Sequence, residues 1–159
     1  GEGTRLRLIG GCRNDGDFQR VSEIKRLAEE LGISDRVEVE VNVPFDRLKQ
    51  SLRQSKIGIH TMWNEHFGIC VVELMAAGVI PVAHNSAGPK QDIVVPIDGK
   101  PTGFLATTEE EYAECLERAL RLSEAESTAM RERAREKARE FSNERFLDAF
   151  KKHIKVLLS

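Results

Sequence analysis

Short apolar segments alternate with helical patterns through much of the chain, and this alternation most constrains its fold. Strands are predicted at residues 5–9, 36–41, 57–60 and 80–83, because each is a brief apolar or alternating run. Helical patterns fill the intervals between these strands. The order strand, helix, strand, helix predicts an α/β fold in which a parallel sheet is covered by helices on both faces.

Two of the predicted helices have clear sequence boundaries. One ends at Gly32, where glycine can adopt a left-handed backbone, and Pro44 begins another that runs to about Ser55. A third is expected from Gly68 to Ala77, ending at Gly78. The first of these helices has an apolar face that is expected to be buried, made of Val21, Ile24, Leu27, Ala28 and Leu31.

The C-terminal part of the chain is expected to add one strand and then helices. Residues 103–106 form the strand, and Thr108 with Glu111 has the spacing of a capping box. A charged helix is expected over about residues 124–141, with a thin apolar stripe. Ser142 is expected to cap a final helix, residues 143–159. That helix is predicted to bury Phe146, Phe150, Ile154 and Leu157.

Length and composition indicate one ordinary globular domain. The 159 residues are 40% hydrophobic and 31% charged, and the net charge of −2 argues against a nucleic-acid binder. Cys12, Cys70 and Cys115 are scattered and odd in number, so neither a disulfide framework nor a zinc site is indicated, and a reducing compartment such as the cytosol fits best. No apolar run approaches the length that spans a bilayer.

In an open α/β sheet, ligands bind beyond the carboxyl ends of the strands. Three loops are therefore of interest, at residues 10–15, 60–67 and 84–90. The second contains Glu65 and leads into Gly68, after which free N–H groups at a helix start can bind an anion. Glu73 lies farther along that helix, and its carboxylate can accept hydrogen bonds from the two hydroxyls of a diol such as ribose.

A purely structural explanation of the two glutamates remains open. Glu65 can complement the helix dipole, and Glu73 can be an exposed helix residue. Glu73 stands between Val72 and Leu74 in a mostly apolar helix, which favours a role in binding.

The segment from Glu65 to Glu73, with Phe67 and Gly68 inside it, resembles the E-x7-E motif of retaining GT-B glycosyltransferases. This resemblance implies a Rossmann-like donor domain, in which Glu65 contacts the donor sugar as the catalytic residue and Glu73 holds the ribose. The backbone at Phe67 and Gly68 would lie against sugar and diphosphate. The candidate donor-binding residues are Glu73, Phe67, Gly68, Ile69, Gly10, Gly11, Arg13, His60 and Asn64.

Three segments, residues 9–14, 60–68 and 83–90, are more specifically similar to eukaryotic α-1,2-mannosyltransferases of asparagine-linked glycosylation. The similarity implies GDP-mannose as donor and a dolichol-diphosphate-linked oligosaccharide as acceptor. It places the reaction on the cytosolic face of the endoplasmic reticulum. No metal or other cofactor is expected, because a helix N-terminus and cationic side chains would stabilise the leaving diphosphate.

The sequence also departs from that family. The Arg and Lys residues that clamp the diphosphate precede the Gly-Gly turn in the family, and the acceptor domain is absent too, so the chain is expected to be a fragment that starts inside the donor domain. On its own this fragment is expected to be inactive. Ala87 stands where many relatives have a second glycine.

Other motifs have simpler explanations. Asp15-Gly16-Asp17 imitates a D-x-D metal motif but follows a strand among turn residues, so a turn with a helix N-cap is favoured. His60, His66 and His84 lack metal-ligand spacing; His60 and His84 line the pocket or have their hydrogen bonds satisfied near strand ends. Trp63 stacks on a base or sugar, or simply packs.

Two other functions fit the fold. A GT-B sugar-nucleotide epimerase shares the architecture but needs its own acid and base in the cleft. A non-catalytic receiver or flavodoxin-type module is disfavoured, because the strand ends at Gly10, Asn42 and His60 offer no phosphoacceptor aspartate. Gly10-Gly11 lacks the full dinucleotide pattern. Guanine as the base follows only from the resemblance.

Overall fold

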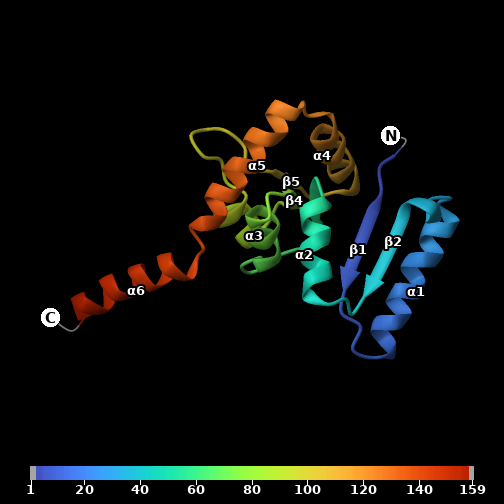
Figure 1. The fold of residues 1–159 in the computed structure, drawn as a ribbon, viewed down its shortest axis with the longest axis horizontal. Helices are drawn as coiled ribbons and strands as arrows, with labels where there is room; N and C mark the ends of the chain where they lie inside the picture. Colours follow the sequence, from blue (N-terminus) through green and yellow to red (C-terminus); the bar gives the residue numbers. More distant parts are fainter. Residues whose placement is uncertain (1–2, 158–159) are drawn as a thin grey trace. The chain divides into compact units, whose positions relative to one another are not determined.

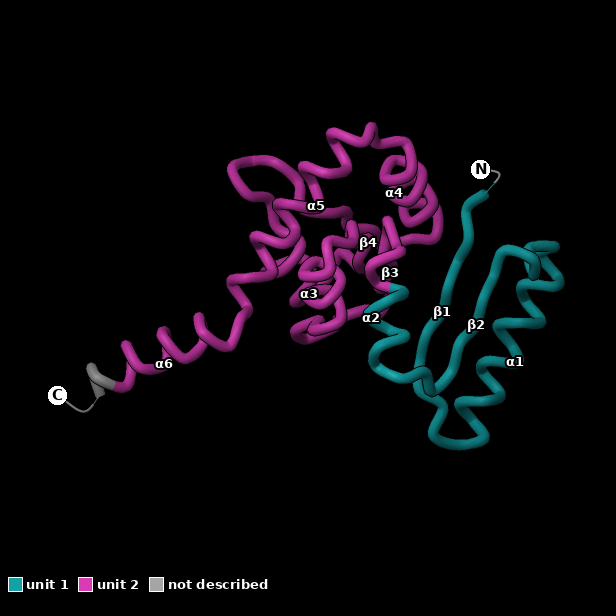
Figure 2. Tube along the Cα trace, in the orientation of Figure 1, with its two compact units in different colours: residues 1–51 teal, residues 52–159 magenta. Residues whose placement is uncertain are grey.

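The computed structural model describes residues 3–157, with side chains described through residue 154. The chain separates into two compact units, Gly1–Ser51 and Leu52–Ser159 (Figure 2). Each unit is an α/β arrangement with its own parallel sheet.

Unit 1 contains two parallel strands and one long helix. Its strands pair from Leu6 opposite Val37 to Gly10 opposite Val41, so their carboxyl ends lie side by side. The Arg7 and Arg47 guanidinium groups lie 3.3 Å and 2.5 Å from the Glu40 carboxylate. The elements are β1 (Leu6–Gly10), α1 (Asp15–Glu30), η1 (Ser34–Arg36), β2 (Val37–Val41) and α2 (Phe45–Gln54), whose last residues fall in unit 2.

The apolar face predicted for α1 is largely exposed, and that prediction was wrong. Ala28 is buried, but Leu27 is 53% exposed and Leu31 is 61% exposed. A two-stranded sheet is too narrow to cover the whole face of a helix of this length. The helix does end as predicted, because Gly32 has a φ of +64° and its N–H donates to the Glu29 carbonyl.

Unit 2 is built on a three-stranded parallel sheet in the order β3–β4–β5. These strands are β3 (Ile57–His60), β4 (Ile80–His84) and β5 (Phe104–Ala106). All five residues of β4 are buried, as expected for a central strand covered on both faces.

Helices cover both faces of this sheet. On one face Ala83 packs with α3 (Ile69–Ala76), η2 (Pro89–Ile93) and α5 (Glu124–Arg139). On the other face Ile80 and Val82 pack with α4 (Glu109–Arg121) and with Met130 of α5. Alternate residues of β4 therefore serve the two cores, since successive side chains of a strand point to opposite faces. The predicted fold class is confirmed, although the strands pair as two sheets, one in each unit.

The helix caps in unit 2 follow the sequence signals. Thr108 and Glu111 form the predicted capping box, and Ser123 with Glu126 forms a second. The Ser142 hydroxyl accepts from the Arg145 N–H at 3.3 Å, at the start of α6.

The prediction that α6 (Asn143–Leu157) is buried was wrong. Figure 1 shows this helix extending away from the rest of unit 2. Phe146 is 66% exposed and Phe150 is 51% exposed, and their rings stack on each other with centroids 5.9 Å apart. The side chain of Leu157 lies outside the described residues. No helix in residues 3–157 has the length and apolar character that crossing a membrane requires.

Candidate functional site

The loop between β3 and α3, residues 61–68, is the centre of the candidate site. His60 ends β3 and Gly68 is the N-cap of α3, so the loop lies at the carboxyl end of a sheet strand. Tyr112 of α4 fixes that strand end, because its hydroxyl donates to the His60 carbonyl at 2.9 Å. Burial raises the pKa of the Tyr112 hydroxyl, which keeps the hydroxyl in its donating form.

Hydrogen bonds hold this loop against the loop after β4. The Asn64 N–H donates to the Ser86 hydroxyl at 2.9 Å, and the Gly88 N–H donates to the Glu65 carbonyl at 3.0 Å. Ser86 also lies 2.8 Å from His84 Nδ1, so the buried His84 has a hydrogen-bond partner, as predicted for it. The two neighbouring carboxyl-end loops of unit 2 therefore form one connected surface.

Two backbone positions explain how closely these loops approach. A Cβ on Gly88 would lie 2.3 Å from the Phe67 carbonyl oxygen, so only glycine fits there. Ala87 has a φ of 41°, a left-handed conformation that favours glycine. Glycine would adopt this backbone conformation without the strain that Ala87 bears.

The N-terminus of α3 is open. Gly68 has φ 96° and ψ 50°, no side chain caps the helix, and its first turn contains no acid. The backbone N–H groups of Ile69 and Cys70 have no hydrogen-bond acceptor among the described residues. Both residues are exposed. Exposed N–H groups at a helix N-terminus form a site for an anion such as a phosphate.

The two predicted glutamates lie on the two sides of this N-terminus in the sequence. Glu65 is partly covered, with its side chain 26% exposed, and Oε2 lies 3.9 Å from His60 Nε2. Glu73 is exposed on α3 and shares one helix face with Ile69 and Cys70, because the three are spaced for neighbouring turns. Its apolar neighbours turn to the core instead, so the charge of Glu73 is available to a ligand.

The remaining side chains of this loop that were considered for the site, Trp63, His66 and Phe67, are exposed. Trp63 is 73% exposed, and its ring has no aromatic or cation–π partner among the described residues. Phe67 is 43% exposed and packs edge-on against Phe141, with ring centroids 5.6 Å apart. His66 is exposed. No group of three or more metal-binding side chains in the described part of the chain is placed to hold a metal ion.

The candidates of unit 1 lie in the turn between β1 and α1. Gly10 and Gly11 are exposed, and the Arg13 side chain is 86% exposed. The Arg13 N–H donates to Asp17 at 3.0 Å, and this bond is the main reason that the pKa of the Asp17 carboxyl lies below its usual value; the guanidinium of Arg13, 3.5 Å away, adds to the effect. The N-cap is Asn14 rather than a residue of the Asp15-Gly16-Asp17 segment, because its side chain accepts from the Asp17 N–H.

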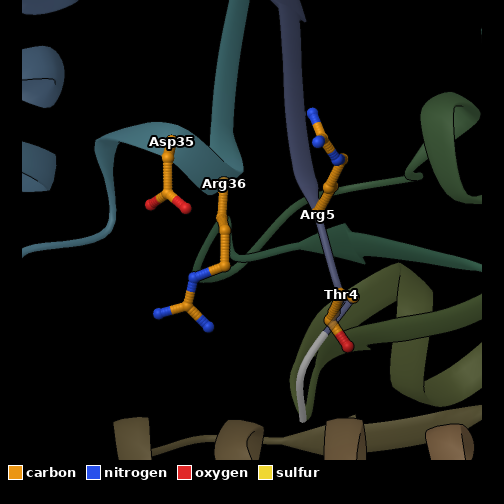
Figure 3. Close-up of a pocket in the computed structure, with 5 residues that line it drawn as sticks. Thr4, Arg5, Asp35 and Arg36 are labelled. Carbon is orange, nitrogen blue, oxygen red and sulfur yellow. The ribbon is translucent and has the colours of Figure 1, made fainter.

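The hollow at the other end of β1 and β2 is not part of this site. It is lined by Gly3, Thr4, Arg5, Asp35 and Arg36, which precede the two strands. Figure 3 shows the Arg5 and Arg36 guanidinium groups pointing in different directions. They do not converge on one ligand.

Ser86, Gly88 and Tyr112 were not anticipated as site residues. Ser86 and Gly88 follow a predicted strand, in a loop that the sequence already marked, so a search for hydroxyl and glycine residues there would have found them. Nothing in the sequence near Tyr112 signals its contact with His60, because 52 positions separate the two residues.

The sequence family that matches the chain is a class of transferases. The chain belongs to the family described as Glycosyl transferases group 1, whose sequence model matches residues 1–141.

Its curated relatives are more specific. The chain is 51% identical over 153 residues to the human GDP-Man:Man(3)GlcNAc(2)-PP-Dol alpha-1,2-mannosyltransferase, covering 96% of this chain and 31% of that protein. It is 49% identical over 156 residues to the Dictyostelium discoideum protein of the same name, covering 98% of this chain and 30% of the relative. The chain therefore spans about a third of the length of the curated relatives it matches.

Solved structures share the fold. A sucrose-phosphate synthase from Thermosynechococcus elongatus superposes with a TM-score of 0.78 at 22% identity, over 97% of this chain and 38% of that one. Anabaena HepE, solved in complex with UDP and glucose, superposes with a TM-score of 0.68 at 22% identity, over 97% of this chain and 40% of that one. At these identities the likeness establishes the architecture alone.

Proposed function

We propose that this chain is the donor-binding domain of a retaining mannosyltransferase that uses GDP-mannose. The acceptor would be a dolichol-diphosphate-linked oligosaccharide, extended in α-1,2 linkage. The single observation that carries the proposal is the open N-terminus of α3, with Glu65 before it and Glu73 within it. The names of relatives about 50% identical to the chain support the choice of donor and acceptor.

The diphosphate binds at the start of α3. The N–H groups of Ile69 and Cys70 donate to its oxygens, and the helix dipole favours the negative charge. Gly68, the N-cap residue, has no side chain that could cap these groups. For Gly10, Gly11 and Arg13, in unit 1, a role in donor binding stays a prediction from the sequence.

Glu73 holds the ribose through its carboxylate. It lies on the same exposed face of α3 as the side chains of Ile69 and Cys70, one turn beyond them. Two acceptor oxygens match the two adjacent hydroxyl donors of a ribose.

Glu65 acts on the mannose. It precedes the helix, so it reaches a sugar beyond the diphosphate, where positive charge develops at the anomeric carbon during transfer. A carboxylate there lowers the energy of the transition state more than that of the bound substrate. Asn64 lies next to Glu65 in the same loop, and His60 ends the strand that leads into it. The leaving diphosphate is stabilised by N–H groups and cationic side chains, so no metal ion is required.

The whole enzyme works at the cytosolic face of the endoplasmic reticulum membrane, in asparagine-linked glycosylation. The acceptor is bound by parts of the protein outside this chain. A donor-binding domain alone neither orients an acceptor nor excludes water from the reacting atoms. The isolated chain therefore binds nucleotide but transfers no mannose.

Calorimetric titration of the chain with GDP, UDP and ADP tests this proposal. GDP should bind most tightly, and Glu73→Gln should weaken GDP binding by about 1.5–3 kcal/mol, because a charge-assisted hydrogen bond is lost. Glu114→Gln is the matched control, since Glu114 is an exposed glutamate on α4. Equal affinity for the three nucleotides, or an unchanged affinity in Glu73→Gln, would contradict the proposal.

A further inference from the structure

His60 has one imidazole nitrogen that no part of the proposed site uses. Its Nδ1 atom is buried and, among the described residues, has no hydrogen-bond partner. The side chain as a whole is 13% exposed, and the backbone of the same residue is fixed by Tyr112. Buried polar atoms without partners are rare, so the arrangement calls for an explanation.

The other nitrogen faces a carboxylate. Nε2 of His60 lies 3.9 Å from Oε2 of Glu65, slightly beyond hydrogen-bond distance. The backbone of Glu65 is held separately, because its carbonyl accepts from the Gly88 N–H at 3.0 Å. Only the side chain of Glu65 has to move for the two groups to bond.

The surroundings of the two imidazole nitrogens favour one tautomer of His60. A proton on Nε2 points at the carboxylate and forms a charge-assisted hydrogen bond, which is stronger than a neutral one. A proton on Nδ1 would instead bury an N–H without an acceptor, and it would set the Nε2 lone pair against the negative charge of Glu65. The Nε2–H tautomer avoids both costs.

We propose that His60 is the positioning residue for Glu65: its Nε2–H holds one carboxylate oxygen and leaves the other free for the donor sugar. This inference rests on the proposed role of Glu65 in mannose transfer. A held carboxylate reaches the sugar without losing rotamer entropy at the moment of reaction. His60 touches neither sugar nor diphosphate in this arrangement and acts through Glu65.

The first test needs no substrate. The sequence has four histidines, so ¹⁵N spectra of their imidazole groups can be assigned by single substitutions. His60 should show the Nε2–H tautomer, and its Nε2 resonance should move in Glu65→Gln but not in the control Glu114→Gln. A proton on Nδ1, or a resonance that ignores Glu65→Gln, overturns the inference.

The second test uses the enzyme that contains this chain, with two substitutions of His60. The amide nitrogen of glutamine can take the place of Nε2, whereas that of asparagine reaches only the place of Nδ1. His60→Asn should lower kcat about tenfold, as expected for the loss of a hydrogen bond to a charged group, while His60→Gln should stay within about threefold of the parent. GDP affinity should be unchanged in both variants, because GDP carries no sugar.

The outcomes separate this inference from the proposed function. Equal losses of kcat in His60→Asn and His60→Gln would overturn the positioning role. If Glu65→Gln leaves kcat unchanged, the proposed role of Glu65 is wrong, and the positioning role is wrong with it even where the spectra confirm the pair. The expected result is the Nε2–H tautomer together with rescue by glutamine and no rescue by asparagine.

Discussion

Two helices of this chain begin after a strand, and their N-termini differ in a way that separates structure from binding. At α1, the Asn14 side chain caps the helix, and Asp15 and Asp17 supply two acids in the first turn. At α3, Gly68 supplies no side chain, no acid lies in the first turn, and two N–H groups are free of acceptors among the described residues. The residues of α1 neutralise the positive end of its helix dipole, whereas the positive end of α3 remains available to a negatively charged ligand.

The comparison shows that a βα turn alone does not indicate an anion site. Both loops contain glycine, but Asp17 already accepts from the Arg13 N–H, and two acids near the start of α1 repel an anion. The open N-terminus of α3 is recognised because it lacks a capping side chain and has no acid in its first turn.

The largest effect is expected at Glu65, in the open turn. Glu65→Gln in the whole enzyme should lower kcat by about 10²–10³-fold, because the residue stabilises charge that develops in the transition state. GDP affinity should hardly change. Steady-state kinetics beside GDP titration measures both. Similar losses of GDP affinity in Glu65→Gln and Glu73→Gln would break the division of labour between the two residues.

An intermediate effect is expected where the two carboxyl-end loops touch. Gly88→Ala should lower the free energy of unfolding by about 1–3 kcal/mol, because the new methyl group collides with the Phe67 and His66 carbonyl oxygens at 2.3 Å and 2.5 Å. Thermal or denaturant unfolding measures this change. Gly99→Ala is the control, since its methyl group meets no atom within 4 Å and only its φ of +73° opposes it. Equal stability of Gly88→Ala and the parent chain would refute the close packing of the loops.

The smallest effect is expected at the capped turn. Asn14→Ala should lower the free energy of unfolding by about 1 kcal/mol, because the first turn of α1 loses its side-chain acceptor. GDP affinity should stay within about threefold of the parent chain, because the residues around the start of α1 already occupy its N-terminus and leave no site for an anion. A large loss of GDP affinity here would show that the β1–α1 turn binds the donor as well.

The sequence predicted the local features of the fold well. Strand positions, the Thr108–Glu111 capping box and the left-handed Gly32 depend on neighbouring residues, so patterns in the sequence suffice for them. The faces of α1 and α6 were predicted wrongly for one reason. An amphipathic pattern shows that a face is apolar, but it does not show that anything covers it.

For the site, the sequence identified the loop but not what holds it. Glu65 and Gly68 stand in a motif of a few residues, and the motif directed attention to them. The contacts of Ser86 with Asn64 and of Tyr112 with His60 join segments 22 and 52 positions apart. Such contacts depend on how the strands pair, which no local pattern specifies.

The most direct test of the open helix start is to close it in the manner of α1. Cys70 is exposed in the first turn of α3, and Cys70→Asp places an acid there without touching the core. The account predicts equal or slightly greater stability, by about 0.3–1 kcal/mol from the helix dipole, together with GDP affinity at least about tenfold weaker through repulsion of the diphosphate. Cys70→Asn, of similar size and without charge, should bind GDP within about threefold of the parent chain. If Cys70→Asp binds GDP as tightly as Cys70→Asn does, the diphosphate does not lie at the N-terminus of α3, and the account of this site is wrong.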